Sequence, residues 1–279
     1  MKEKPEISFE FFPPKTEKGI QNLNKVRDEL GALKPKYFSV TFGAGGSTQD
    51  GTYDAVKSII DAGYEGAPHV SCVGSSKESI KTMLQGYAKI GVKRLVALRG
   101  DLPSGMVERG DFHYANELVA FIREEFGDQF HIEVASYPEF HPESRSPKTE
   151  FENFKRKVDA GASSAITQYF FNSDAYFSFV ETAESYGINV PIIPGIMPIT
   201  NFSQLARFSN MCGAEIPRWL YKRLEEYQDD EASLISFGLD YITFLTETLL
   251  SNGVHGVHFY ALNKSHPTLE ICHRLQLGE

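Results

Sequence analysis

Several features that mark other classes of protein are missing from this sequence. The formal net charge is −9 and no run of lysine or arginine offsets it, which argues against a nucleic-acid partner. The three cysteines form no Cys-x-x-Cys pair, which is typical of free thiols in a reducing compartment. The N-terminal residues lack an apolar signal-peptide core, and no apolar run approaches the roughly 20 residues that cross a bilayer. The sequence therefore predicts a cytoplasmic protein with neither a membrane nor a nucleic-acid partner.

Familiar catalytic and metal motifs are also missing. Neither Gly-x-Ser-x-Gly nor His-Glu-x-x-His occurs, so a serine hydrolase and a zinc protease lack support. His255 and His258 lie three apart on an expected strand and so face opposite sides, and no metal site is expected. The glycine-rich segment Thr41–Ser47 has Thr48 in place of the third glycine of a dinucleotide fingerprint, and Thr52 stands where a phosphate loop needs lysine. This segment is expected to be a loop at the mouth of a barrel.

A strand and helix pattern repeats along the chain. Amphipathic stretches end near glycines, which can take the left-handed conformation that closes a helix. These glycines are Gly31, Gly63, Gly91, Gly127, Gly161, Gly187 and Gly253. Eight β-branched or aromatic runs are the expected strands: Ile7–Phe12, Tyr37–Phe42, His69–Val73, Arg94–Leu98, Ile132–Tyr137, Ala165–Phe170, Val190–Ile196 and Val254–Tyr260. Alternating strands and helices predict a parallel sheet of the α/β class.

Eight such units favour a closed (β/α)8 TIM barrel over the alternative, an open doubly wound sheet. The interval from Gly187 to Gly253 is much longer than the others, which predicts extra helices between strands 7 and 8. The segment Tyr137–Glu150 is rich in Pro, Glu and Ser and is expected to be a long loop after strand 5. No interdomain linker is evident, so residues 1–279 are expected to form a single catalytic domain.

Active sites of barrels lie at the C-terminal ends of the strands. In the first strand Ile7, Phe9 and Phe11 share one face, which leaves Glu10 pointing into the barrel near its upper end. Burial there raises the pKa of a carboxyl group and favours its protonated form, as a general acid requires. A structural glutamate held by hydrogen bonds is an equally good interpretation of this position alone.

Three further segments are candidates for ligand binding. Arg99-Gly100-Asp101 leaves strand 4 together, although an Arg–Asp pair that braces a turn explains it somewhat better. Gln168 in strand 6 offers a donor and an acceptor to a heterocycle, or a hydrogen bond within the barrel. Lys155-Arg156-Lys157 is by default a solvated basic cluster, yet it is also the best candidate for diphosphate contact.

Taken together and in order, these segments resemble the methylenetetrahydrofolate reductase family over nearly the whole chain, at the length of its bacterial form without a C-terminal regulatory domain. The stretches that carry the resemblance are Phe9–Pro14, Val40–Ala44, Pro68-His69, Ala97–Asp101, Tyr137–Glu139, Lys155–Gly161, Ile166–Phe171, Pro194–Pro198 and His258–Asn263. Each motif alone is weak, whereas the ordered set is specific.

The resemblance implies noncovalent FAD at the top of the barrel. NADH or NADPH would reduce it and leave, and the folate would then take the same face in a ping-pong cycle. The products would include 5-methyltetrahydrofolate, which serves one-carbon metabolism and methionine biosynthesis. Glu10 would be the acid that helps protonate N10, so that the folate ring opens to an iminium cation, and Asp101 would place negative charge near that cation. A homo-oligomer in the cytoplasm is the expected state.

The resemblance also assigns the binding residues. Contacts to the pterin would come from Asp101 and Gln168, stacking from Phe208 with Gln204 beside it, and a further folate contact from Lys264. Cofactor contacts would come from Thr41, Phe42, Ala44, His69, Arg99, Gly100, Asp101, Tyr114, Ala115, Tyr137, His141, Glu150, Asn153, Arg156 and Lys157. Arg156 and Lys157 would face the diphosphate.

The chain departs from the family pattern at three positions. Phe42 stands where tyrosine is common, Glu150 where aspartate is common, and Lys264 where arginine is common. Glu150 can still accept a hydrogen bond from a ribose, whereas Lys264 loses the planar fork of arginine. Two alternatives to the reductase are a barrel lyase or aldolase and a flavin or folate storage protein. The strands carry no convincing inward lysine for a Schiff base, and storage would not need Glu10 or Asp101.

Overall fold

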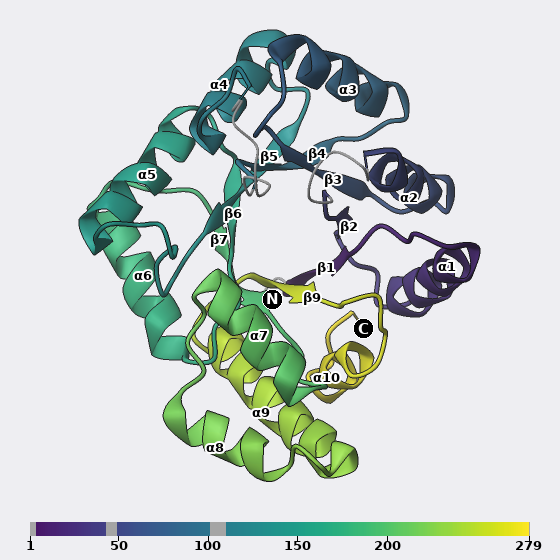
Figure 1. Cartoon of the computed structure of the whole chain (residues 1–279), viewed down its shortest axis with the longest axis vertical. Coiled ribbons are helices and arrows are strands. Elements are labelled where there is room, and N and C mark those ends of the chain that lie inside the picture. Colours follow the sequence, from purple (N-terminus) through teal and green to yellow (C-terminus); the bar gives the residue numbers. More distant parts are fainter. Residues whose placement is uncertain (1–3, 43–48, 101–109, 279) are drawn as a thin grey trace.

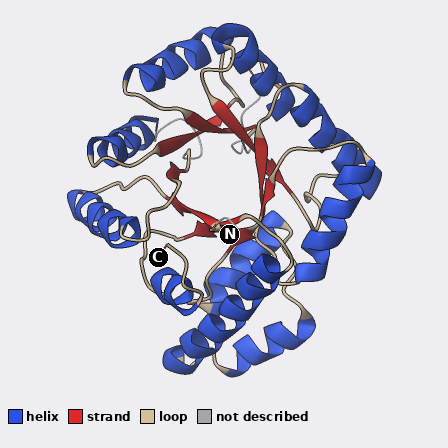
Figure 2. Cartoon of the chain, turned by 180° about the vertical axis from the view of Figure 1, so that it is seen from behind, coloured by secondary structure: helices blue, strands red, loops and turns tan. Residues whose placement is uncertain are grey.

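A ring of parallel strands forms the centre of the molecule (Figures 1 and 2). The computed structural model describes residues 4–42, 49–100 and 110–278. Within them one sheet has the order β7-β6-β5-β4-β3-β2-β1-β9-β8, and every neighbouring pair is parallel. The strands are β1 (Glu6–Phe11), β2 (Tyr37–Val40), β3 (Gly66–Ser71), β4 (Arg94–Leu98), β5 (His131–Ser136), β6 (Ser164–Thr167), β7 (Ile192–Ile193), β8 (Gly195–Ile196) and β9 (Gly256–Tyr260).

Helices surround this ring, and Figure 2 shows them outside the strands. They are α1 (Glu17–Gly31), α2 (Gln49–Asp61), α3 (Lys77–Lys89), α4 (Ala115–Phe126), α5 (Pro147–Asp159), α6 (Ser173–Ser185), α7 (Phe202–Cys212), α8 (Arg218–Glu226), α9 (Glu231–Ser251) and α10 (Thr268–Arg274). The barrel and the extra helices before the last strand are therefore confirmed, because α7, α8 and α9 all lie between β8 and β9. Of the helices in the described ranges, none is both long and apolar enough to cross a membrane.

The seventh expected strand, Val190–Ile196, is one run of chain split at Pro194. Its first half, β7, pairs with β6, and its second half, β8, pairs with β9. Proline has no backbone N–H to give to a ladder, so the strand breaks there. The carbonyl of Pro194 still accepts a hydrogen bond from the backbone N–H of His258 at 3.0 Å. The nine strands are thus the eight expected ones with this single interruption.

The alternation expected in β1 is confirmed. Ile7, Phe9 and Phe11 are fully buried in the core between the strands and the helices. The Phe9 ring packs between Phe38 and Phe259, at centroid distances of 5.7 and 5.9 Å. This apolar face anchors β1 against its two neighbouring strands and leaves its other face to the barrel interior.

Glycines end most of the helices as expected, and Gly31 is an exception. Gly63, Gly91 and Gly187 all have φ between 75° and 89°, the left-handed region that favours glycine. Gly31 instead ends α1 in ordinary helical geometry, and the prediction of a left-handed residue there is wrong. A Cβ on Gly31 would lie 2.1 Å from the Tyr64 hydroxyl, so the position needs glycine for close packing.

Candidate functional site

Glu10 lies near the upper end of β1 between two histidines that belong to other strands. Its Oε2 atom is 3.3 Å from Nε2 of His69 on β3 and 3.7 Å from Nε2 of His258 on β9. The Glu10 side chain is 13% exposed, against 8% for His69 and none for His258. The expected inward carboxyl is therefore present, and it has a small opening to solvent.

The electrostatics of Glu10 differ from the sequence-based expectation of a raised pKa. Burial does raise the pKa of this carboxyl group, but the charge of His69 and the close approach of the His258 and His69 Nε2 atoms outweigh it. With both imidazoles acting as donors, the pKa falls from 4.5 to about 2. The prediction failed because it counted burial alone and did not foresee that two histidines from distant strands converge on one oxygen.

His258 has a second partner inside the barrel. Its Nδ1 atom lies 2.7 Å from Oγ of Ser8, and the Tyr37 ring stacks on the imidazole at a centroid distance of 5.9 Å. Sequence reasoning assigned no role to Ser8, Tyr37 or His258. Strand alternation could have found His258, because it aligns with Ser8 in the register of β9 on β1 and faces the same interior.

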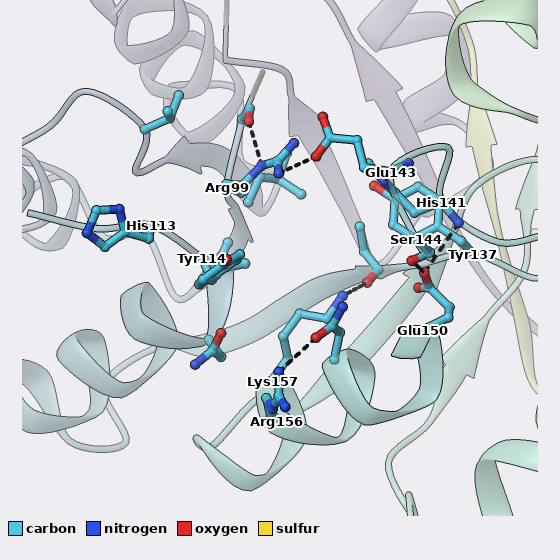
Figure 3. Close-up of a pocket in the computed structure, with 18 of the residues that line it drawn as sticks. Arg99, His113, Tyr114, Tyr137, His141, Glu143, Ser144, Glu150, Arg156 and Lys157 are labelled. Carbon is cyan, nitrogen blue, oxygen red and sulfur yellow. Dashed lines mark hydrogen bonds and ion pairs between the residues drawn. The ribbon is translucent and has the colours of Figure 1, made fainter. Parts of the chain in front are cut away.

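A cavity of about 1070 Å³ opens at the C-terminal ends of β4 and β5 (Figure 3). The start of α4 and the inner face of α5 complete its walls, together with the long loop that follows β5. Ten residues that the family resemblance assigned to the cofactor line this one cavity: Arg99, Gly100, Tyr114, Ala115, Tyr137, His141, Glu150, Asn153, Arg156 and Lys157. The fold thus gathers side chains from four separate segments of the sequence.

The basic cluster on α5 is divided between the cavity and solvent. Lys157 lines the cavity, its Nζ donates to the Ala135 carbonyl at 2.5 Å, and burial lowers the pKa of its ammonium to about 8. Arg156 also lines the cavity and donates to Asn153 Oδ1 at 3.0 Å. Lys155 points elsewhere and pairs with Asp159 at 2.9 Å. One helix thus carries two cations toward the cavity and one away from it.

The loop after β5 and the first turn of α5 supply another part of the wall. The expected loop Tyr137–Glu150 is wrong at its end, because α5 already begins at Pro147 and Glu150 lies in its first turn. Glu150 is only 3% exposed and accepts hydrogen bonds from the Ser144 hydroxyl and the His141 backbone N–H. The Tyr137 and His141 rings meet edge to face at 4.7 Å, and burial lowers the pKa of His141. The sequence marked this loop for its composition, but its individual wall residues Glu143, Ser144 and Arg145 were missed.

Contacts within the protein explain why arginine and glycine stand at positions 99 and 100, at the end of β4. Arg99 Nη1 pairs with Glu143 Oε2 at 2.6 Å, which ties β4 to the loop after β5 (Figure 3). Gly100 has φ of 85°, and a Cβ there would lie 1.9 Å from Ser71 Oγ. The glycine is therefore required by the turn and by Ser71 before any ligand is considered. The Arg–Asp pair considered for this segment involves Asp101, which lies outside the described residues. Ala44, another residue assigned to the cofactor, also lies outside them.

The remaining assigned residues do not line the large cavity. Thr41 and Phe42 follow β2, and the Thr41 backbone N–H donates to the Phe11 carbonyl at 2.9 Å. Gln168 lines a smaller hollow that shares Tyr137 with the large cavity. The others lie apart from both: His69 contacts Glu10, Gln204 and Phe208 lie one turn apart on α7, and Lys264 is exposed after β9.

Lys264 nevertheless lies in a turn that is tied to β1. The side chain of Asn263 accepts from the Phe12 backbone N–H at 2.8 Å and donates to the Phe12 carbonyl at 2.9 Å. This double hydrogen bond holds the turn after β9 over the end of β1. Only Phe11 separates Phe12 from Glu10 along the chain, so the turn lies at the same end of the barrel as the carboxyl group.

The cluster of Glu10, His69 and His258 invites comparison with a metal site. In the part of the chain that the structure describes, no group of three or more His, Cys, Asp or Glu side chains could hold a metal ion. Both Nε2 atoms point toward the carboxyl group without a hydrogen bond of good geometry. Proton exchange between nitrogen and oxygen is the chemistry that this arrangement can support.

Comparison with known proteins identifies the family. The chain is 41% identical over 272 residues to 5,10-methylenetetrahydrofolate reductase of Escherichia coli K12, which covers 96% of this chain and 90% of that protein. It is 36% identical to methylenetetrahydrofolate reductase (NADH) 1 of Arabidopsis thaliana, over 97% of this chain and 48% of the plant protein. A solved structure of a Clostridium thermocellum protein, described as binding two copies of 5-methyl-5,6,7,8-tetrahydrofolic acid, covers 99% of this chain and 96% of that chain with a TM-score of 0.71. That likeness, at 16% identity, concerns the fold alone. The family profile for methylenetetrahydrofolate reductase matches residues 1–276, and the chain therefore belongs to this family of oxidoreductases.

Proposed function

We propose that this protein reduces 5,10-methylenetetrahydrofolate to 5-methyltetrahydrofolate with electrons from NADH or NADPH, using noncovalent FAD in the cavity between β4, β5, α4 and α5. The observation that carries the proposal is that ten residues assigned to the cofactor by the family resemblance line this one cavity. Its volume of about 1070 Å³ lies at the upper end of the usual range for ligand sites, as a long dinucleotide requires.

The side chains of the cavity fit such a group. Lys157 is a cation that burial destabilises, so an anionic diphosphate beside it would restore favourable charge. Arg156 on the same helix adds a second donor. Glu150 is buried and already accepts two hydrogen bonds, which is the chemistry that holds a ribose hydroxyl. When bound, FAD would carry hydride from the nicotinamide to the folate, with the two substrates using the site in turn.

The residues of this chain would then orient the folate and move a proton. Glu10 would deliver a proton to N10, so that the five-membered ring opens to the cation that accepts hydride. Gln168 would hydrogen-bond the pterin, and Phe208 would stack on it with Gln204 alongside. Lys264, held near β1 by the turn at Asn263, would contact the folate, and Asp101 would stabilise positive charge. Thr41, Phe42, Ala44 and His69 would complete the cofactor contacts.

The name of the Arabidopsis relative supports NADH as the donor. No clamp for a ribose 2′-phosphate stands out in the sequence, and NADPH is the alternative. We further propose a cytoplasmic homo-oligomer formed of single-domain chains, on the family resemblance.

The visible absorption spectrum of the purified protein tests the cofactor directly. We expect a flavin spectrum, or its recovery on adding FAD, and bleaching by NADH without oxygen. A colourless protein that FAD cannot reconstitute would contradict the proposal.

A matched pair of lysine variants tests the place of the cofactor. Lys157→Met removes the cation in the cavity, whereas Lys155→Met removes a neighbouring lysine that pairs with Asp159 outside it. We expect the first variant to weaken FAD binding about tenfold or more, since a charge-assisted bond is worth about 1.5–3 kcal/mol. The second should bind FAD like the parent, and equal losses in both would argue against this site.

A further inference from the structure

Glu10 must carry a proton to act as the proposed acid. The two imidazoles beside it can instead favour its ionised, carboxylate form. The groups that face this carboxyl are His69 from β3, Tyr37 from β2, and His258 and Tyr260 from β9. An imidazole nitrogen that carries hydrogen stabilises the carboxylate, and one that carries a lone pair stabilises the protonated acid. The tautomer of His258 is therefore central to whether Glu10 is an acid.

A fixed negative charge lies at the opposite, N-terminal end of the barrel. Glu133 on β5 is 2% exposed and pairs with Arg94 Nη1 at 2.6 Å, and Ser164 Oγ donates to it at 2.7 Å. Burial raises the pKa of Glu133, but hydrogen bonds from His131 and Ser164 and the charge of Arg94 lower it to about 2. An ionised carboxylate only accepts hydrogen bonds.

The direction of each following hydrogen bond is set by this anion. The Tyr37 hydroxyl donates to Glu133 Oε1 in a long hydrogen bond of 3.5 Å. Burial raises the pKa of Tyr37 well above its ordinary value, and the nearby Ser8 hydroxyl, its register partner on β1, opposes this rise. With its own hydrogen used, the Tyr37 oxygen can only accept from that hydroxyl. Ser8 has then used its own hydrogen, so its oxygen accepts from Nδ1 of His258 at 2.7 Å. We call this series of residues, Glu133, Tyr37, Ser8 and His258, the axial line.

We propose that the axial line holds His258 as the neutral tautomer protonated at Nδ1, so that its Nε2 accepts a hydrogen bond from protonated Glu10. His258 is then a positioning residue for the proton that the reaction consumes. The inference rests on the proposed role of Glu10 as the acid and deepens it.

This arrangement also accounts for one buried atom. Nε2 of His258 has no partner of good geometry among the described residues, although it is fully buried and 3.7 Å from Glu10 Oε2. A lone pair opposite an ionised carboxylate would be repelled, whereas a protonated carboxyl group can close the gap as a donor. The Nδ1–H tautomer therefore removes one of the two donors that lower the pKa of Glu10, and His69 remains as the other.

Tyr37→Phe breaks the axial line and leaves Glu10, His258 and the residues of the cavity in place. The Ser8 hydroxyl is then free to donate to Nδ1 of His258, which places hydrogen on Nε2 and favours the Glu10 carboxylate. The rate at which reduced flavin reduces the folate falls at high pH, where Glu10 loses its proton. In Tyr37→Phe this fall should begin at a pH at least one unit lower than in the parent. At a fixed pH within the falling part of the profile, the variant should therefore be about tenfold slower than the parent. Ser8→Ala removes the hydroxyl that accepts from Nδ1, and it should also move the fall in rate to lower pH.

Two controls remove similar hydroxyl groups outside the axial line. Tyr176→Phe deletes a buried phenol that donates to the Ile192 carbonyl at 2.7 Å, and Ser136→Ala deletes a buried hydroxyl near the Ile166 carbonyl. Both should keep the pH profile of the parent. Reduction of the flavin by NADH should be unchanged in all four variants, since it does not use the proton of Glu10.

The tautomer itself is measured in the parent protein with ¹⁵N-labelled histidine, with His258 assigned by the loss of its signals in His258→Gln. We expect a protonated, pyrrole-type Nδ1 and an unprotonated, pyridine-type Nε2. A pyrrole-type Nε2, alone or in an imidazolium, would overturn the inference, as would a parent-like pH profile in Tyr37→Phe. If Tyr37→Phe does not fold, the spectrum of the parent decides.

The failure of the inference is distinguishable from failure of the proposed function. If Glu10→Gln reduces folate at the parent rate, Glu10 is not the acid and the proposed mechanism fails. Glu10→Gln could instead lose folate reduction while Tyr37→Phe keeps the parent pH profile and Nε2 of His258 proves to be protonated. In that case only the role of His258 is wrong.

Discussion

Two buried glutamates lie at opposite ends of one barrel, and they differ in what surrounds them. Glu133 at the lower end is enclosed by a full set of donors, including the Arg94 guanidinium at 2.6 Å. Glu10 at the upper end has two imidazoles at 3.3 and 3.7 Å and a side chain that is 13% exposed. A permanent cation makes Glu133 a fixed charge, whereas groups that can gain or lose a proton make Glu10 adjustable. The difference separates a carboxylate that stabilises the fold from one that can do chemistry.

The largest effect should come from Glu10→Gln, which keeps the shape and removes the proton. We expect folate reduction to fall by about 10²–10⁴-fold, the usual contribution of a general acid, while NADH still reduces the flavin. Stopped-flow measurement of the two half-reactions separates these steps. Glu6→Gln changes an exposed glutamate on the same strand and should leave both rates unchanged. Equal losses in both half-reactions would point to a structural role for Glu10.

Glu133→Gln should give the opposite outcome, a loss of stability. Among the described residues it leaves the buried Arg94 with Glu65 as its one remaining ion-pair partner, and removing one member of a buried pair costs about 3–5 kcal/mol. Urea unfolding measures this. Asp240→Asn breaks an exposed pair with Arg274 at 2.7 Å and should cost less than about 1 kcal/mol. A loss for Glu133→Gln as small as that of the control would contradict a structural role.

Acid unfolding distinguishes the two carboxyl groups. The pKa of Glu133 falls from 4.5 to about 2 on folding, so its stabilisation is complete above pH 4.5 and is lost as the pH drops toward 2. This amounts to about 3 kcal/mol at about 1.36 kcal/mol per unit. Glu133→Gln should therefore flatten the stability curve between about pH 5 and 2. Glu10→Gln should not flatten it if Glu10 is protonated in the folded protein, and an equal flattening in both variants would show that Glu10 is ionised.

The smallest effect should come from His131→Asn at the rim of the lower end. His131 is 37% exposed, and its Nε2 lies 2.5 Å from Ser164 Oγ and 3.5 Å from Glu133. Losing one such polar contact should cost about 0.5–1.5 kcal/mol and leave folate reduction unchanged. A larger loss, or a shift in the pH profile of folate reduction, would mean that the exposed rim takes part in holding the axial line.

Much of the fold could be predicted because it rests on local patterns. Strand alternation placed Glu10 inside the barrel, and the long interval before the last strand predicted α7, α8 and α9. The break at Pro194 was missed because the whole run is apolar and resembles a continuous strand. Gly31 was expected to close α1 in the left-handed conformation, whereas glycine is needed there for packing against Tyr64, a partner that is distant in sequence.

The candidate site was harder to predict for the same reason. The residues of the cavity were found by resemblance to a family, not by spacing, because four separate segments supply them. The pKa of Glu10 could not be predicted from β1 alone, since His69 and His258 come from other strands. Pairwise geometry between distant strands is what a sequence pattern does not contain.

The contact between β1 and β9 has a consequence for how the protein is made. Ser8 and His258 are 250 positions apart, and in the described part of the chain β9 is the strand that pairs with this edge of β1. During synthesis from the N-terminus, this edge stays uncovered until nearly the whole chain has left the ribosome. A chain that stops before residue 256 would therefore have both an open barrel edge and a Glu10 that lacks His258, one of its two imidazole partners. Premature termination would therefore remove activity and also expose an unpaired strand edge. Incomplete chains should aggregate and should not accumulate as folded, inactive enzyme.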